Sequence, residues 1–153
     1  MPCGCARPLR LNCNTLDALT SMNDLPTISD KGDLIAATQL VVLGYPAVRD
    51  ILPDLFTWIQ DGNWPVARII APFLASLGNP SVPEIWKILR SDDLLWKYWC
   101  ISMVIAELPL DVAVEFEPEL QRMVDSPDEP EQYEELDRVA REALEHLAVR
   151  HNA

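Results

Sequence analysis

One stretch of this chain occurs twice in succession, and this recurrence constrains the fold more than any other feature. Residues 35–55 and 69–89 share nine identities over 21 aligned positions. The identical pairs are Ile35/Ile69, Ala37/Ala71, Leu40/Leu74, Leu43/Leu77, Gly44/Gly78, Pro46/Pro80, Val48/Val82, Ile51/Ile85 and Leu55/Leu89. Most of them are apolar residues at helical spacing. Such a repeat, with a period of roughly 30–47 residues, is typical of solenoids built from pairs of helices.

A second register competes with this first one. It aligns segments 53–55, 83–85 and 118–120, each of which consists of a proline, an acidic residue, and a leucine or isoleucine. We call it the proline register, and we call the first one the glycine register. We prefer the glycine register, because Gly44 and Gly78 are each followed two residues later by a proline and so define the same corner. A third copy of the repeat follows, but it is degenerate.

The apolar periodicity predicts seven helices separated by glycine, proline and polar turns. We expect them over residues 33–43, 46–59, 65–77, 82–89, 92–108, 111–124 and 131–149. Pro53 and Pro118 lie inside two of these helices. They should kink them, because a proline ring clashes with the carbonyl group four residues earlier. Ser91 is the expected cap of the fifth helix.

These elements predict an all-α fold, a right-handed αα-superhelix of about three helical hairpins with a polar C-terminal capping helix. One hairpin cannot bury its own apolar face, so stacking supplies the core. We expect a single helical-repeat domain over residues 30–149. Residues 1–29 have no sustained apolar period, and we expect them to form a poorly ordered N-terminal tail.

The charge distribution limits the classes of partner. The formal net charge is −12. Residues 1–106 carry 8 basic and 10 acidic side chains, whereas residues 107–153 carry 4 and 14. Such a chain has few cations with which to replace the counterions of a phosphate backbone. We therefore expect no nucleic-acid partner and no membrane partner, and favour another protein, preferably a basic one. The sequence carries no indication of the oligomeric state.

The four cysteines do not suggest a disulfide framework. Cys3, Cys5 and Cys13 lie near the N-terminus, whereas Cys100 lies in an apolar helix and is expected to be buried. Three thiolates could bind zinc, but a structural zinc site needs four ligands, and no fourth lies nearby. We expect free thiols, a reducing cytoplasmic location, and neither a metal nor a cofactor.

Two short segments carry a resemblance to a known family. The sequence NWPVA at residues 63–67, together with SDDLLWKYW at residues 91–99, resembles the signature of a small bacterial domain family of unknown function. The resemblance extends over about residues 25–147. It implies a HEAT-like helical-repeat fold and a cytoplasmic bacterial protein. It implies no activity, so no catalytic residue is carried over.

The tryptophans are candidate binding residues. All five lie close together in the sequence, at positions 58, 64, 86, 96 and 99. Aromatic anchors dominate the binding energy of many protein interfaces, although packing in the core is the commoner use. Trp64 and Trp96 are the best candidates for exposure. Each begins the second helix of its hairpin, so both could line the same edge of the stack.

Four charged residues complete the candidate site. Asp92, Asp93 and Lys97 surround Trp96 in the sequence, and Arg68 follows Trp64. Helix capping and an Asp93–Lys97 ion pair would explain three of them without any binding role. We include all four as candidate partner-binding residues.

The sequence therefore favours a non-catalytic protein-binding module, which would dock its partner against Trp64 and Trp96. An alternative is an immunity or antitoxin protein that neutralises a basic bacterial toxin. A further alternative is an enzyme of unknown type with a site on the concave face. Phosphate-binding loops, serine-nucleophile elbows and zinc-protease motifs are missing from the sequence. A carboxylate beside Arg68 in a pocket would favour the enzyme.

Overall fold

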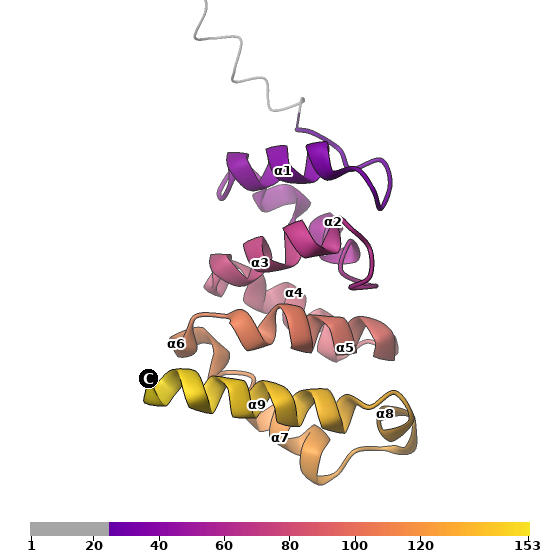
Figure 1. Cartoon of the computed structure of the whole chain (residues 1–153), viewed down its shortest axis with the longest axis vertical. Coiled ribbons are helices and arrows are strands. Elements are labelled where there is room, and N and C mark those ends of the chain that lie inside the picture. Colours follow the sequence, from indigo (N-terminus) through magenta and orange to yellow (C-terminus); the bar gives the residue numbers. More distant parts are fainter. Residues whose placement is uncertain (1–24) are drawn as a thin grey trace, which may run out of the picture.

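The computed structural model describes residues 25–153, and every regular element in this part of the chain is a helix (Figure 1). The α-helices are α1 (Leu34–Leu43), α2 (Leu52–Thr57), α3 (Ala67–Leu77), α4 (Val82–Leu89), α5 (Leu94–Met103), α6 (Leu110–Ala113), α7 (Glu117–Asp125), α8 (Glu129–Tyr133) and α9 (Leu136–Asn152). Three 3₁₀ turns join them, namely η3 (Arg49–Ile51), η4 (Asn79–Ser81) and η5 (Ile105–Glu107). The predicted all-α class is thus confirmed for the described residues.

The helices are stacked in two layers along the long axis of the molecule (Figure 1). Helices α1, α3, α5 and α9 follow one another in a front layer, and each contacts the next. Helices α2 and α4 contact each other behind them, and α7 packs against α9 at the far end. The front helices all run in the same direction. After each of them the chain crosses the molecule through the back layer, so the next front helix begins on the same side as the one before it (Figure 1).

Both competing repeat registers occur, but in different layers. Gly44 and Gly78 end α1 and α3 with φ of 67° and 64°, as the glycine register requires. However, α2 and α4 begin at Leu52 and Val82, which are related by the shorter offset of the proline register. The connection from Gly44 to α2 is correspondingly longer than that from Gly78 to α4. The glycine register therefore holds only for the front helices, and the back helices follow the proline register.

The prolines of the back helices begin helices and do not kink them. Pro53 and Pro118 lie in the first turns of α2 and α7, so the two predicted kinks are wrong. A proline in the first turn loses no intrahelical hydrogen bond, because the amides there have no helical partner. The apolar residue of the repeated triplet is buried in every copy, at Leu55, Ile85 and Leu120.

Four predicted helices differ from their expected ranges. The helix expected over 46–59 is represented by η3 and the shorter α2, and the helix expected over 111–124 is divided into α6 and α7. Helix α5 ends at Met103, not at residue 108, and η5 follows it. Pro109 cannot donate to the carbonyl of Ile105, which accepts instead from the amide of Leu108 at 3.3 Å. The last predicted helix is divided into α8 and α9 by Glu135, whose φ is 59°. Neither glycine nor proline marks that division in the sequence.

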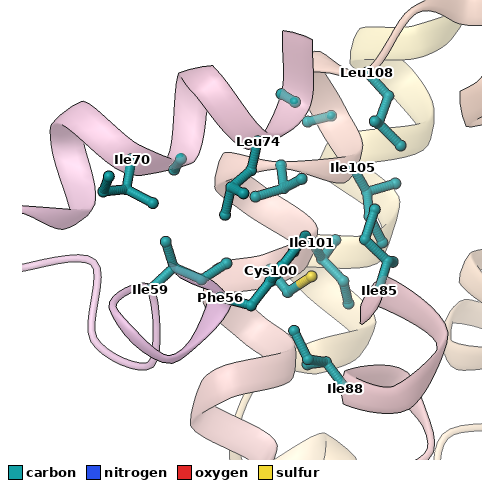
Figure 2. Packing of buried hydrophobic residues seen from close by; sticks show 14 of the residues in the cluster. Phe56, Ile59, Ile70, Leu74, Ile85, Ile88, Cys100, Ile101, Ile105 and Leu108 are labelled. Atoms are coloured by element: carbon teal, nitrogen blue, oxygen red, sulfur yellow. The ribbon is translucent and has the colours of Figure 1, made fainter. Parts of the chain in front are cut away.

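A single hydrophobic core extends through the stack, from Ile28 to Leu147. Figure 2 shows its central part, where side chains of α2, α3, α4 and α5 meet. Cys100 is fully buried there, and burial raises the pKa of its thiol. The predicted role of Cys100 as a small core residue is confirmed. The candidate thiols Cys3, Cys5 and Cys13 lie outside the described residues.

One ion pair joins α7 to α8 in a nearly buried position. Glu131 is only 3% exposed, and its carboxylate accepts hydrogen bonds from Arg122 at 2.6 and 3.1 Å. The amide of Asp128 donates to the same carboxylate at 3.0 Å. Hydrogen bonding from Arg122 is the main reason that the pKa of Glu131 is lowered.

Among the described helices, none has the length and apolar character required to cross a membrane.

Candidate functional site

Trp96 lines a groove that lies between α2, α4 and the beginning of α5. The groove has a volume of about 300 Å³. Its walls come from α2, α4 and the first turn of α5, and consist of Pro53, Asp54, Phe56, Thr57, Glu84, Lys87, Ile88 and Trp96. Trp96 is half-buried and packs against the core with one part of its ring. It is the sequence-predicted candidate that the structure places in a groove.

The beginning of α5 is held by Asp93. Its carboxylate accepts a hydrogen bond from the amide of Trp96 at 2.9 Å, which makes Asp93 the N-cap. Ser91, the expected cap, instead donates its hydroxyl to the carbonyl of Ile88 at 2.7 Å. Asp93 thus places Trp96 through the backbone and does not itself line the groove. This supports the capping explanation that the sequence offered.

The side chain of Trp96 forms a hydrogen bond with α2, which forms another wall of the groove. Its Nε1 donates to the carbonyl oxygen of Phe56 at 3.1 Å, although the two residues are far apart in sequence. Phe56 is 1% exposed and belongs to α2. The hydrogen bond fixes the indole ring across the junction of α2 and α5, and the groove wall is therefore preformed.

We expect Trp96→Phe to lower the free energy of unfolding by about 0.5–1.5 kcal/mol, because the Phe56 carbonyl loses its donor while most of the ring surface remains. Urea denaturation measures this change. Leu95→Ala is a suitable control, since Leu95 is a neighbouring residue of α5 that is 48% exposed. A Trp96→Phe midpoint equal to that of the wild type would show that the hydrogen bond does not hold the ring.

The groove carries two carboxylates in unlike electrostatic settings. Glu84 pairs with Lys87 at 2.6 Å, and its side chain is 15% exposed. Asp54 is exposed, and it has no cationic partner within 4 Å among residues 25–153. Phe56 and Ile88 also line the groove but are only 1 and 2% exposed, so Pro53 and Trp96 supply its accessible apolar surface. The groove therefore presents apolar wall, one ring and one uncompensated negative charge.

Trp64, the other predicted anchor, is placed differently. Its ring meets that of Trp58 edge to face, with centroids 6.2 Å apart, and it packs partly against the core. Trp99 covers Gly62 so closely that a Cβ there would overlap its ring. The connection between α2 and α3 is thus packed with indole rings. Trp64 does not line the groove.

The remaining predicted residues lie apart from the groove. Arg68 is on the exposed side of α3 and lines none of the three hollows described for residues 25–153. Asp92 is exposed at the turn before α5. Lys97 is half-buried, and its charge contributes to the lowered pKa of Glu131. No Asp93–Lys97 ion pair forms within 4 Å in this described part of the chain.

Sequence reasoning missed the two groove carboxylates, although a signal for them exists. Asp54 and Glu84 each follow the proline of the repeated triplet. Because α2 and α4 are equivalent helices, equivalent positions lie at the same end of both. The proline register, applied to the back helices alone, would have placed these two acids side by side in the stack.

A second aromatic arrangement lies between α4 and α7. Trp86 donates to a carboxylate oxygen of Glu115 at 2.7 Å and lies against Phe116, with ring centroids 5.1 Å apart. The guanidinium carbon of Arg90 lies 5.0 Å from the Trp86 ring centroid. These contacts use both the ring face and the indole N–H of Trp86, which makes it a structural residue joining two hairpins.

Residues 25–153 contain no group of three or more His, Cys, Asp or Glu side chains arranged to hold a metal ion. The stacked helices and the groove define the class: an all-α domain with a small aromatic and acidic recess. The family described as Domain of unknown function (DUF5071) matches residues 27–144, and the chain belongs to this family. The expected membership in a family of unknown function is thereby confirmed. A comparison with the curated proteins finds no match.

Proposed function

We propose that this chain is a non-catalytic protein-binding module that holds a basic partner in the Trp96 groove. The observation that carries this proposal is the juxtaposition of an anchored, half-buried tryptophan with the unpaired carboxylate of Asp54, seen within the described residues 25–153. Tryptophan is among the residues that most often dominate binding energy at protein interfaces. A preformed wall lowers the entropy cost of binding, because little has to be ordered.

The chemistry of the groove suits a lysine or arginine side chain. Its methylene stem would lie along Trp96 and the exposed Pro53, and its cationic head would approach Asp54. The net charge of −12 attracts a basic protein over a longer range and disfavours acidic ones. Because Glu84 already pairs with Lys87, Asp54 supplies the charge that selects the partner.

We further propose that the stack is a right-handed αα-superhelix of HEAT-like type. The two positive-φ glycines that end α1 and α3 support this, as does the return of each back helix to the same side. Successive hairpins in such folds present equivalent positions in a row, and extended surfaces of this kind bind other proteins. Asp54 and Glu84 are one such pair of positions.

Charge reversal inside and outside the groove tests the proposed site. We expect Asp54→Lys to lower recovery of a basic partner from the native cell by about tenfold or more, since a cation would then meet a cation. Asp50→Lys is the matched control, because Asp50 is exposed on the adjoining η3 turn but does not line the groove. Recovery is measured by quantitative pull-down, followed by titration calorimetry with the recovered protein.

Equal recovery by the wild type, Asp54→Lys and Asp50→Lys would remove the groove from the proposal. Loss with both variants would mean that net charge alone governs binding. If the wild-type chain recovers no basic protein, the binding function itself is overturned.

The acidic C-terminal end favours one narrower function, immunity or antitoxin activity against a basic bacterial toxin. Eleven carboxylate side chains are exposed between Glu107 and Glu145. A surface of this sign would approach a nuclease-like toxin and compete with its nucleic-acid substrate. Glu145→Lys separates the two surfaces: it should weaken a partner held by the acidic end and leave one held by the Trp96 groove unchanged.

A further inference from the structure

The outer face of α1 is apolar and is not covered by any of the described residues. Four of its large side chains are between 42 and 80% exposed, namely Leu34, Ile35, Val42 and Leu43. They line an open hollow of about 680 Å³ together with three other residues, Pro26, Thr38 and Gln39. None of the seven carries a charge. We call this surface the α1 face. Exposed apolar patches of this kind often mark interaction sites.

The internal repeat indicates that the α1 face is suited to contact another helix. The glycine register aligns two of its residues with residues of α3, as the pairs Ile35/Ile69 and Leu43/Leu77. The two α3 residues are packed against the core, and α1 contacts α3 as the preceding helix of the front layer (Figure 1). Ile35 and Leu43 carry the same side chains, but no described helix precedes α1. The α1 face therefore has the residues of a helix–helix contact without the second helix.

We propose that a second copy of this chain supplies that helix, so that two copies form a two-fold symmetric dimer through their α1 faces. Antiparallel α1 helices are favoured, because the positive end of each helix dipole then lies beside the negative end of the other. In such a pair, a residue near one end of α1 meets a residue near the other end of the partner's α1. Ile35 of one copy then lies near Leu43 of the other, and the uncharged Thr38 and Gln39 lie close to the symmetry axis.

The charge distribution favours a second copy in this orientation. Residues 1–106 carry 8 basic and 10 acidic side chains, whereas residues 107–153 carry 4 and 14. Because α1 and α7 lie at opposite ends of the stack (Figure 1), a dimer through α1 keeps the two strongly acidic ends far apart. Pairing of the acidic ends would bring like charges together. Pairing of an acidic end with an α1 face would desolvate carboxylates against an apolar surface.

The size of the α1 face sets the expected strength of the dimer. Interfaces that bury less than about 1,200 Å² in total are typical of weak, transient association. Two α1 faces, each with an apolar patch of roughly a few hundred Å², belong to this class. We therefore expect a reversible dimer with a dissociation constant in the micromolar range. The α1 face shares no residue with the Trp96 groove, so this inference goes beyond the proposed function and does not depend on it.

Sedimentation velocity of the full chain over a series of concentrations tests the dimer. The wild type should change from monomer to dimer as its concentration rises. Val42→Glu should raise the dissociation constant by about tenfold or more, because two like charges then enter an apolar interface. Val42 is 80% exposed in the single chain, so the substitution leaves the fold intact. Val149→Glu is the matched control, since Val149 is 69% exposed on α9, and it should leave the dissociation constant unchanged.

Methyl NMR on a mixture of differently labelled copies tests the arrangement. Ile35 and Leu43 are about 12 Å apart along α1, so their methyl groups make no contact within one helix. We expect contacts between the Ile35 methyl groups of one copy and the Leu43 methyl groups of the other. These contacts should disappear in Val42→Glu and persist in Val149→Glu.

Three results would overturn the proposal. A wild type that stays monomeric up to millimolar concentration has no second copy on the α1 face. Equal dissociation constants for Val42→Glu and Val149→Glu would assign the dimer to another surface or to net charge. A dimer that shows no contact between Ile35 and Leu43 of different copies would not have the antiparallel α1 pair.

Discussion

Phe116→Ala is expected to destabilise the protein by about 3–5 kcal/mol, the largest effect that we predict for a single substitution. Phe116 is fully buried at the beginning of α7, and its ring contacts that of Trp86 in α4. Truncation removes the apolar contacts and leaves a cavity between two hairpins. The surrounding helices cannot close it without losing the hydrogen bond between Trp86 and Glu115.

The urea midpoint, with the slope of the transition, measures this change. Val114→Ala is the matched control, because Val114 lies two residues away and is 53% exposed. Its effect should stay within about 0.5 kcal/mol. Similar midpoints for the two variants would mean that α4 and α7 do not share a continuous core.

The second large effect concerns the Glu131–Arg122 ion pair. We expect Glu131→Gln to cost about 1.5–3 kcal/mol at pH 7, in the range of hydrogen bonds to charged groups. The lower half of this range is favoured, because the Arg122 side chain is 41% exposed and water screens the pair. Glu134→Gln is the control, because Glu134 is an exposed neighbour of Glu131 and forms no ion pair with any described residue.

The same pair makes stability depend on pH in a definite direction. The pKa of Glu131 is lowered in the folded protein from its ordinary value of 4.5. Its contribution is therefore fully present above pH 4.5 and is lost as the pH falls through the lowered pKa. The wild type should lose its advantage over Glu131→Gln across that acidic interval. A constant difference between the two proteins from pH 7 downward would contradict this linkage.

Three helices near the middle and the start of the stack were predicted closely. Helices α1, α3 and α4 were expected over 33–43, 65–77 and 82–89, and they span 34–43, 67–77 and 82–89. Their apolar residues recur at local spacing, and Gly44 and Gly78 end two of them with positive φ. These are interactions between residues close in sequence, and a periodic pattern records them directly.

The groove was only partly predictable. Trp96 was identified because it begins the second helix of its predicted hairpin and was therefore expected at an edge of the stack. Trp64 meets the same criterion, but its ring packs edge to face against that of Trp58. Which of the two lines a groove depends on the path of the connection between α2 and α3. Asp54 is distant from Trp96 in sequence, so only the packing of α2 on α5 relates them.

By itself, the sequence determined the helical class, the glycine-terminated ends of α1 and α3, and the acidic character of the C-terminal third. These follow from backbone sterics, side-chain periodicity and composition, which act locally or by simple summation. Only the tertiary structure decided that Pro53 begins a helix, that Glu131 is buried beside Arg122 and that one side of α1 is left uncovered by the described residues. Each of these depends on which residues, distant in the sequence, come into contact when the helices stack. A local sequence pattern does not predict such contacts.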